Sequence, residues 1–485
     1  MSTPAQVLPM ENARENAPES EIQRIFRHQR AFAPSLRTTT AAERIAKIRK
    51  LRDLVQAHAQ QIHLAAAADY GKPQAEVDLA EIMPIVAEAN HTMANLKRWM
   101  KPRRVPTIRS MLGTSSWIKS EPRGVCLIIA PWNYPVNLAF VPLISAIAAG
   151  NTAIIKPSEL APHLSAVIAK IVRENFDARE VAVFEGDATV ATELLAQPFD
   201  HIFFTGSPQL GKIVMAAAAK HLASVTLELG GKSPTLIDAS ADLKMAARSV
   251  LWAKFTNAGQ TCIAPDYVYV HNDVKDAFLA ECKAGIEEVY GTDAQQQMRS
   301  PDYCRIVNAR HYARVSGLLE DAIRRGAQVV VGGATRAEDR FIAPTVLSNV
   351  PRDAGVMQEE IFGPLLPVLG YSDLDQAIAD INRGEKPLAL YVYARNDKVV
   401  DRVLNNTTAG GTCINGAVVH FLQHHLPFGG VNNSGIGAYH GVHGFRAFSH
   451  ERAVVKVHYA SIRMFYPPYT DQVKRMIKLA MKWFI

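Results

Sequence analysis

Residues 125–156 read VCLIIAPWNYPVNLAFVPLISAIAAGNTAIIK. Two short apolar runs, VCLIIA and TAIIK, stand on either side of NLAFVPLISAIAAG, a segment with the length of a helix. This alternation is typical of βαβ units. It continues with a helix near 159–175, the run VAVFE, HIFF at 201–204, a helix that opens near Ser207, and VTLEL at 225–229. We therefore predict a doubly wound parallel sheet with right-handed crossovers, whose ligands bind beyond the carboxyl ends of the strands.

The second half of the chain shows the same kind of alternation. After LELGGKSP at 227–234 come the apolar runs VVVGG, APTVL, LALYVYA and GTCING. This pattern predicts a second α/β domain that begins near residue 230. The chain has 485 residues, more than the roughly 250–300 at which a single core stops growing, so two domains with a cleft between them are expected.

The N-terminal part of the chain consists of a segment without an apolar core, followed by a helix. Residues 1–20 contain no apolar core segment, so they are predicted to be a disordered leader and not a signal peptide. The first strong helix follows at TTTAAERIAKIRKLRDLVQ, where Thr40 and Glu43 have the spacing of a capping box. Ile45, Ile48, Leu51 and Val55 are predicted to form its apolar face.

The composition is that of a globular protein from a reducing compartment. Hydrophobic residues make up 48% of the chain and charged residues 20%, which allows a large core. The five cysteines, at 126, 262, 282, 304 and 413, form no CxxC pair. Disulfides, structural zinc and secretion are therefore disfavoured, and a cytoplasmic protein is expected.

Most of the net charge of +7 comes from the C-terminus. Residues 451–485 hold seven Lys or Arg against Glu451 and Asp471, and no basic and aromatic recognition motif occurs elsewhere, which disfavours nucleic acid binding. In 473–485, VKRMIKLAMKWFI, the basic residues lie opposite an apolar face. That predicted face consists of Val473, Met476, Ile477, Ala480, Met481 and Phe484. Such a helix can lie in a membrane interface but cannot span the membrane, and the alternative is packing on the protein's own surface or on a second subunit.

Cys262 is the candidate nucleophile. It lies in NAGQTCIAPDY, a segment of small residues without apolar periodicity, whereas Cys126 lies in an apolar run and Cys282 in an apparent helix. An isolated cysteine is more often inert than reactive, because reactivity requires access and a lowered pKa. The neighbouring motifs must therefore decide its role.

Two further segments could hold a phosphate or a sugar. Gly206 and Gly211 in FTGSPQLGK flank a strand-to-helix turn that could direct N–H groups at a phosphate, although two glycines in a tight turn explain the pattern equally well. In KPSE, Lys156 could bind hydroxyl or phosphate oxygens and Glu159 could accept from a ribose diol. Without further evidence, a lysine and a glutamate at such positions more often have a structural role than a ligand-binding one.

Seven motifs, in order, resemble those of the aldehyde dehydrogenase superfamily. They are PWNYP at 131–135, KPSE at 156–159, FTGS at 204–207, LELGGKSP at 227–234, GQTC at 259–262, EEIFGP at 359–364 and PFGG at 427–430. IAPDY after the cysteine, EKPLALYVY and NNSGIGAYHGVHGFRAFSH are further similar to the class 3 branch, which includes fatty and aromatic aldehyde dehydrogenases, coniferyl aldehyde dehydrogenases among them.

The resemblance implies roles for four residues. A thiolate at Cys262 would attack the aldehyde, and the side-chain amide of Asn133 with the Cys262 N–H would stabilise the oxyanion. Hydride then leaves the hemithioacetal, and Glu228 would activate the water that cleaves the thioester. Tyr134 would contact the substrate, and no metal is implied. Without the resemblance, Glu228 could be an ordinary strand-end charge.

The resemblance also implies a nicotinamide cofactor. Its expected contacts are Lys156, Glu159, Gly206, Ser207, Gly211, Glu360 and Phe362. Glu360 would hold the nicotinamide ribose and Phe362 would brace the ring. Glu159 favours NAD, since it would repel a 2′-phosphate, but NADP remains open.

The implied fold is that of aldehyde dehydrogenases: an α/β protein with a Rossmann-like cofactor domain, a second α/β catalytic domain and a small oligomerisation β-arm. The expected divisions are a disordered leader at 1–20, an NAD(P)-binding domain at 21–229 with the arm inserted at 102–122, a catalytic domain at 230–434, a return and bridging strand at 435–469, and a basic tail helix at 470–485. A homodimer is expected, with 102–122 and 451–460 as candidate exchanged strands.

The expected activity is NAD(P)-dependent oxidation of an apolar aldehyde to its carboxylic acid, with medium- or long-chain aliphatic aldehydes first and aromatic ones second. The tail would contact a membrane peripherally, or cover the substrate entrance as in some long-chain relatives.

One competing interpretation is a CoA-acylating relative, against which the retained Glu228 argues. Another is a catalytically silent, membrane-associated scaffold, against which the presence of Cys262, Glu228 and Asn133 argues.

Overall fold

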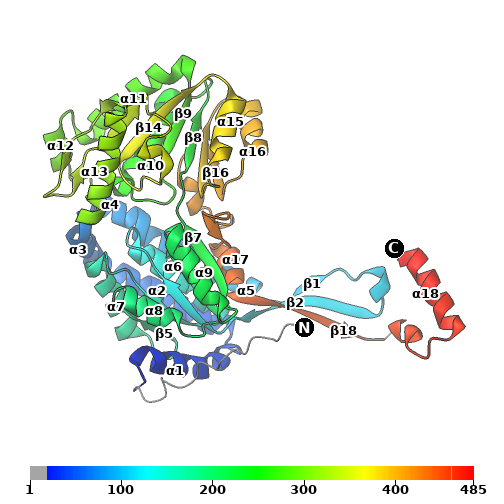
Figure 1. Ribbon diagram of the computed structural model, residues 1–485. Coiled ribbons are helices and arrows are strands. Elements are labelled where there is room, and N and C mark those ends of the chain that lie inside the picture. The colour runs from blue at the N-terminus through cyan, green and yellow to red at the C-terminus, as the bar shows by residue number, and fades with distance from the viewer. Residues whose placement is uncertain (1–18, 460, 485) are drawn as a thin grey trace, which may run out of the picture.

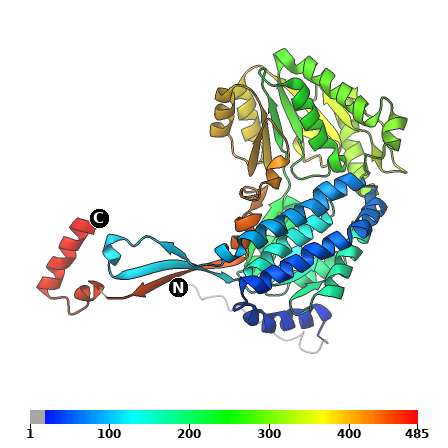
Figure 2. The ribbon, with the colours of Figure 1, turned by 180° about the vertical axis from the view of Figure 1, so that it is seen from behind.

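Figures 1 and 2 show the computed structural model, which describes residues 19–459 and 461–484. Two α/β bodies lie one above the other, and a β-arm projects from the lower body with the C-terminal helix at its far end. Residues 1–18 of the predicted leader lie outside the described residues. Of its last two residues, Ser20 caps the first helix, α1 (Glu21–Leu36), by accepting from the N–H of Gln23.

The sheet of the lower body has the strand order β17-β7-β6-β3-β4-β5. Its parallel strands are β3 (Val125–Ile129), β4 (Thr152–Lys156), β5 (Val181–Val183), β6 (His201–Gly206) and β7 (Ser224–Leu229). This confirms the predicted parallel sheet. A short strand, β17 (Gly435–Ile436), pairs antiparallel to β7 at the edge. It was not predicted because two residues form no apolar run.

Helices cover both faces of this sheet. They are α1, α2 (Ala41–Ala57), α3 (Ala59–Tyr70), α4 (Gln74–Val77), the π-helix η1 (Asp78–Ile82), α5 (Met83–Trp99), α6 (Pro135–Ala149), α7 (Pro162–Asn175), α8 (Ala188–Leu195), α9 (Pro208–Ala219) and α17 (Gly441–Ala447). In β3, Cys126 and Ile128 join one buried cluster while Leu127 and Ile129 join another. Successive side chains of a strand point to opposite faces, so β3 is covered on both sides.

The predicted first helix is confirmed as α2. Thr40 and Glu43 form the capping box, and Ile48, Leu51 and Val55 are fully buried. Ile45 is half-buried at the margin of the same cluster. Sequence periodicity therefore identified the face of α2 that packs on the body.

The upper body is the predicted second α/β unit. Its sheet has the order β10-β13-β14-β9-β8-β15-β16, with only β10 antiparallel to its neighbour. The strands are β8 (Pro234–Ile237), β9 (Tyr267–His271), β10 (Gln328–Val331), β13 (Thr345–Ser348), β14 (Leu365–Tyr371), β15 (Ala389–Tyr393) and β16 (Gly411–Ile414). A separate small hairpin consists of β11 (Thr335–Arg336) and β12 (Phe341–Ile342).

Helices and short turns complete the upper body. They are α10 (Leu243–Phe255), η3 (Thr256–Gly259), η4 (Asn272–Val274), α11 (Lys275–Tyr290), α12 (Ala294–Arg299), α13 (Ala309–Arg324), α14 (Gly355–Gln358), α15 (Leu374–Arg383), α16 (Asp397–Asn406) and η5 (Val419–Leu422). The chain passes from β7 in the lower sheet to β8 in the upper sheet through residues 230–233. The carboxyl end of β7 therefore faces the upper body, and the parallel β3, β4 and β6 end at the same edge.

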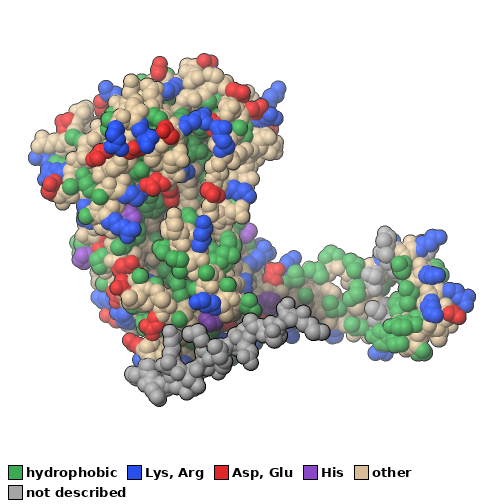
Figure 3. Space-filling model, in the orientation of Figure 1, with side chains coloured by type: hydrophobic (Ala, Val, Ile, Leu, Met, Phe, Trp, Pro, Cys, Tyr) green, Lys and Arg blue, Asp and Glu red, His purple; other side chains and the backbone are tan. Residues whose placement is uncertain are grey.

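The arm is a three-stranded antiparallel sheet of β1 (Arg103–Val105), β2 (Thr114–Pro122) and β18 (Ser449–Val457), with the turn η2 (Arg109–Met111) between β1 and β2. Beyond it follow η6 (Ser461–Phe465) and the tail helix α18 (Asp471–Phe484). In Figure 3, hydrophobic side chains gather along the arm, and Lys and Arg lie at its outer end. Among the described residues, no helix is long and apolar enough to cross a membrane.

Candidate active site

Cys262 lies in the loop between η3 and β9, and it is half-buried. The preceding turn is unusual, because Asn257, Ala258 and Gly259 all have positive φ. A Cβ on Gly259 would lie 2.3 Å from the carbonyl oxygen of Gly363, so only glycine fits there. The turn thereby holds the segment GQTC against EEIFGP.

The thiol of Cys262 is protonated in this environment. Burial raises its pKa to about 12, and the nearby carboxylates of Glu360 and Glu228 act in the same direction. The thiolate is the nucleophilic form, so a reaction at this sulfur requires a group that accepts its proton.

Glu228 is a titratable group that interacts electrostatically with this thiol. It lies in β7 opposite Gly435 of β17, and it is only 3% exposed. Neither carboxyl oxygen has a hydrogen-bond partner, and burial raises the pKa of Glu228 well above its usual value. A carboxyl without partners that is electrostatically coupled to a thiol can exchange protons with it or with a water.

Asn133 is buried beneath the cysteine loop. Its side-chain Nδ2 donates to the carbonyl oxygen of Gln260 at 3.0 Å. Its own carbonyl oxygen accepts from Asn257 Nδ2 at 3.1 Å, and from Tyr70 and Lys72 at 3.3 Å. An amide nitrogen carries two protons, so Asn133 has a second donor beyond its structural bond.

Cys262 lies in the wall of an apolar cavity of about 150 Å³. Tyr134 lies in its wall, and the Tyr134 hydroxyl and Thr261 Oγ1 are 2.6 Å apart. The Lys72 ammonium lies 4.1 Å from the centre of the Tyr134 ring. Most of the remaining wall is aliphatic or aromatic, with Leu79, Met83, Leu138, Trp252, Ile263, Val418, Phe421, Leu422, Phe428 and Tyr439. Such a wall suits an apolar ligand.

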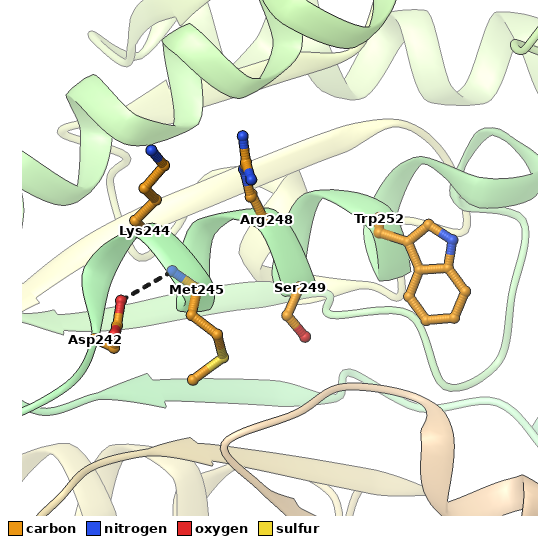
Figure 4. A pocket seen from close by; sticks show the side chains of 6 residues that line it. All are labelled: Asp242, Lys244, Met245, Arg248, Ser249 and Trp252. Atoms are coloured by element: carbon orange, nitrogen blue, oxygen red, sulfur yellow. Dashed lines mark hydrogen bonds between the residues drawn. The ribbon is translucent and has the colours of Figure 1, made fainter.

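A second hollow, on the outer face of α10, does not reach the thiol. Figure 4 shows Lys244 and Arg248 extending from one side of the helix and Met245 and Ser249 from the other. Asp242 caps this helix by accepting from the Met245 N–H at 3.1 Å. The hollow is shallow and open, and its polar groups do not converge as those of a binding site do.

The KPSE residues lie at the carboxyl end of β4. Lys156 is buried, Glu159 is half-exposed, and Lys156 Nζ lies 2.6 Å from a Glu159 carboxylate oxygen. This pair presents one cation and one anion at the sheet edge where parallel folds bind ligands. Its chemistry fits the hydroxyls of a ribose.

The glycine-rich turn after β6 has packing reasons for its composition. A Cβ on Gly206 would lie 2.5 Å from the Phe204 ring, and one on Gly211 would lie 2.7 Å from Leu229. Ser207 caps α9, and its hydroxyl accepts from the Leu210 N–H. Close packing alone therefore explains why both positions are glycine. The N-terminus of α9 is nevertheless directed at the same sheet edge as Lys156.

The EEIFGP loop carries Glu360 and Phe362. A Cβ on Gly230 would lie 2.1 Å from a Glu360 carboxylate oxygen, and burial raises the pKa of Glu360 to about 8. Phe362 has φ 44°, and its ring meets that of Trp132 edge-on at 5.4 Å between centroids.

Several residues that fix this loop were missed by the sequence analysis. Arg314 donates to the Ile361 and Glu360 carbonyl oxygens at 2.7 and 3.2 Å, and the Ile361 N–H donates to Asp266 at 3.0 Å. Asp266 also pairs with Lys232. These contacts join segments far apart in the chain, so no local pattern marks them.

Lys254 was also missed. It is fully buried in α10, its Nζ has no hydrogen-bond partner, and burial lowers its pKa to about 8. One signal was present in the sequence, a lysine within the apolar run VLWAKF. Cys126 and Cys282, in contrast, are buried core residues.

Two α/β bodies that meet over a half-buried cysteine, a buried carboxyl and an apolar cavity have the architecture of the aldehyde dehydrogenase fold. The chain belongs to the aldehyde dehydrogenase family, whose pattern matches residues 4–454. This confirms the resemblance drawn from the seven motifs.

Individual relatives agree with this assignment. The chain is 50% identical over 436 residues to the putative aldehyde dehydrogenase AldX of Bacillus subtilis, covering 90% of this chain and 98% of AldX. It is 43% identical to the 4,4′-diaponeurosporen-aldehyde dehydrogenase of Staphylococcus aureus, covering 93% and 98%. The match to human aldehyde dehydrogenase family 3 member B1 is 42% over 92% and 94%, which agrees with the class 3 branch.

A solved structure has the same fold. The substrate-bound Staphylococcus aureus AldH superposes with a TM-score of 0.89 at 42% identity, covering 95% of this chain and 99% of that one. Enzymes of this family use a nicotinamide dinucleotide as the hydride acceptor.

Proposed function

We propose that the protein oxidises apolar aldehydes to carboxylic acids with NAD(P). Medium- and long-chain aliphatic aldehydes are its preferred substrates, and aromatic aldehydes rank second. The observation that carries this proposal is the apolar cavity that has Cys262 in its wall. An alkyl chain would lie along the aliphatic and aromatic wall and place its carbonyl carbon at the sulfur.

Cys262 and Glu228 divide the reaction between them. In its ionised form, Glu228 accepts the thiol proton directly or through water, and the sulfur then forms a bond to the carbonyl carbon. The free N–H of Asn133 and the Cys262 backbone N–H stabilise the negative oxygen of the resulting hemithioacetal. After the carbon has lost hydride and Glu228 has released the thiol proton to solvent, the carboxylate of Glu228 deprotonates a water. That water attacks the thioester carbon, the carbon–sulfur bond breaks to release the acid, and the sulfur takes up a proton.

The bound nicotinamide cofactor supplies the acceptor for that hydride. Lys156 and Glu159 would bind ribose hydroxyls, while the turn with Gly206, Ser207 and Gly211 would approach the phosphates. Glu360 would bind the second ribose and Phe362 would brace the nicotinamide ring. Because the carboxylate of Glu159 repels a 2′-phosphate, we propose that NAD is preferred over NADP.

We further propose a homodimer built through the arm. The arm projects from the body, and Val455 and Val457 of its edge strand β18 are about half exposed. A narrow antiparallel sheet with an apolar surface gains stability by packing on another chain.

The tail helix has an amphipathic face that suits either a lipid surface or a partner subunit. Val473, Met476, Ile477 and Ala480 are half-buried, while Lys474 and its basic neighbours are exposed. Leu479 and Met481 are also exposed, although Met481 was predicted on the apolar face. The side chain of Phe484 lies outside the described residues. We propose peripheral membrane contact, which would deliver lipophilic aldehydes to the cavity.

The test is nucleotide reduction by the purified protein with straight-chain aldehydes of increasing length, together with benzaldehyde and coniferaldehyde. Activity that rises with chain length supports the proposal, and a preference for aromatic aldehydes would correct its substrate class. Activity that requires coenzyme A would indicate the acylating alternative. Absence of turnover with every aldehyde would contradict the proposal.

A further inference from the structure

Three side chains of the kinds that bind divalent metals meet beside the apolar cavity. Glu88 comes from α5, His424 from the segment after η5, and His440 from the residue before α17. One possible ligand atom of each lies within 4.8 Å of those of the other two. None of them takes part in the proposed reaction, although His440 also lines the cavity.

The carboxylate of Glu88 is the centre of this cluster and is only 1% exposed. Its Oε1 accepts from the Gly441 N–H at 2.8 Å and from Thr92 at 3.3 Å. Its Oε2 lies 2.9 Å from Nδ1 of His424. The surrounding backbone is closely fitted, since a Cβ on Gly441 would lie 2.2 Å from the His424 carbonyl oxygen.

His440 leaves an unsatisfied group at this place. Its side chain is 94% buried, and Nδ1 has no hydrogen-bond partner. The ring interacts with the backbone of Phe421 through a hydrogen bond. Buried polar atoms nearly always have a partner, so an unpaired imidazole nitrogen beside a carboxylate calls for a missing group.

We propose that Glu88, His424 and His440 bind one divalent transition-metal ion of the zinc type. Two imidazole nitrogens and one carboxylate oxygen suit Zn²⁺, whereas Mg²⁺ and Ca²⁺ prefer oxygen ligands throughout. Ligand atoms around tetrahedral zinc are about 3.3 Å apart for bonds of about 2.0–2.1 Å. The Glu88–His424 separation of 2.9 Å is already close to this value, and a ring nitrogen of His440 lies within 4.8 Å of both ligand atoms.

A metal bound at Nδ1 of His424 would replace the hydrogen bond that this nitrogen now forms with Glu88. The fourth metal position would be taken by water. Next to the cluster, the ring centroid of His91 lies 5.4 Å from that of His424, and the ring centroid of the exposed His425 lies 4.8 Å from that of His91.

The ion would join three segments that form one wall of the cavity. It would tie α5 to the segment after η5 and to the start of α17, and thus fix the position of Phe421 and His440 in that wall. An effect on aldehyde turnover rests on the proposed function. Binding of the metal does not, because it is measured without a substrate.

The experiment is equilibrium dialysis of the full-length protein against zinc sulfate, with the bound metal counted by mass spectrometry. We expect one Zn²⁺ per chain, and binding at least about 100-fold weaker in His424→Ala and Glu88→Gln, because each loses a ligand. His425→Ala is the matched control, since it removes the neighbouring histidine outside the cluster. Cys262→Ala and Cys413→Ala exclude zinc held by a thiol, and all three controls should retain the ion.

Thermal unfolding shows whether each variant still folds, so loss of a metal ligand can be distinguished from misfolding. Zinc should raise the Tm of the wild-type protein and of His425→Ala, but not that of His424→Ala or Glu88→Gln, because a ligand stabilises only the state that binds it. Failure of the wild-type protein to bind zinc would overturn the proposal. So would binding that persists in His424→Ala and disappears in Cys262→Ala, or equal loss in His425→Ala.

Discussion

Gly259 and Gly363 lie in contact, and a Cβ added to Gly259 would come within 2.3 Å of the Gly363 carbonyl oxygen. Gly259 also has φ 73°, in the region that side chains other than glycine rarely adopt. The contact joins the loop of the proposed nucleophile to the loop of Glu360 and Phe362. The position of the thiol therefore depends on a backbone contact between two segments that are distant in sequence.

Gly259→Ala should lower both stability and turnover. The positive φ and the collision with Gly363 together should cost about 1–3 kcal/mol, and the displaced loop should move Cys262 away from the cavity. Urea unfolding and steady-state rates measure the two effects separately.

Two other glycines provide the controls for this substitution. Gly326 has φ 106° with nothing near its Cβ position, whereas Gly317 lies within α13 with open space and no positive φ. Gly326→Ala should therefore show backbone strain alone, and Gly317→Ala should be neutral or slightly stabilising. A Gly259→Ala protein with wild-type turnover would contradict the role of the contact.

Glu228→Gln should nearly abolish turnover, because glutamine cannot accept a proton from the thiol or from water. A loss of about 10²–10⁴-fold is expected for a general base. The same substitution should change the pH dependence of stability. Between the usual pKa of glutamate and the raised pKa of Glu228, only the unfolded chain releases the proton, so wild-type stability falls as pH rises.

Glutamine has no such titration, so the stability of Glu228→Gln relative to the wild-type protein should increase from pH 5.5 to pH 8. The difference in the free energy of unfolding can change by at most about 1.4 kcal/mol per pH unit. Urea unfolding at both pH values measures it. If the difference in the free energy of unfolding between the two proteins does not change with pH, Glu228 is ionised in the folded state.

The sequence predicted the strands and the main catalytic candidates because both have local causes. Strands such as β3 and β4 are buried on both faces and therefore appear as continuous apolar runs, and the motif around Cys262 is contiguous. Arg314 and Glu88 could not be found in this way. Their partners lie on other elements, and only folding brings them within hydrogen-bond distance.

Alkylation of Cys262 should be slow at neutral pH in the protein without cofactor. Because burial raises the pKa of this thiol to about 12, the thiolate fraction, and with it the rate with iodoacetamide, should increase about tenfold per pH unit from pH 7 to pH 10. Cys262→Ala is the control, since the buried Cys126 should not react. Rapid alkylation that levels off near pH 7 would indicate a thiolate stabilised in the folded protein.

Glu159→Gln should improve the use of NADP relative to NAD. The substitution removes the negative charge expected to repel a 2′-phosphate, and it frees the Lys156 ammonium that now pairs with it at 2.6 Å. The ratio of kcat/KM for the two cofactors should shift by about tenfold toward NADP, which corresponds to 1.4 kcal/mol. Glu185→Gln, which breaks a surface pair with Arg173, should leave the ratio unchanged. An unchanged ratio in Glu159→Gln would show that this carboxylate does not face the ribose.

Deletion of residues 470–485 should separate the possible roles of the tail helix. If α18 contacts lipid, the truncated protein should lose its binding to anionic vesicles while its sedimentation remains that of a dimer, because the basic residues and the apolar face of α18 are removed together. Replacing Lys474, Arg475, Lys478 and Lys482 by Gln should weaken vesicle binding by about 1 kcal/mol per residue and make it less sensitive to salt. If the helix instead packs on a partner subunit, deletion should shift the protein toward monomer, and vesicle binding should be weak in the full-length chain as well. A changed chain-length preference with unchanged vesicle binding and unchanged dimer would assign the helix to the substrate entrance.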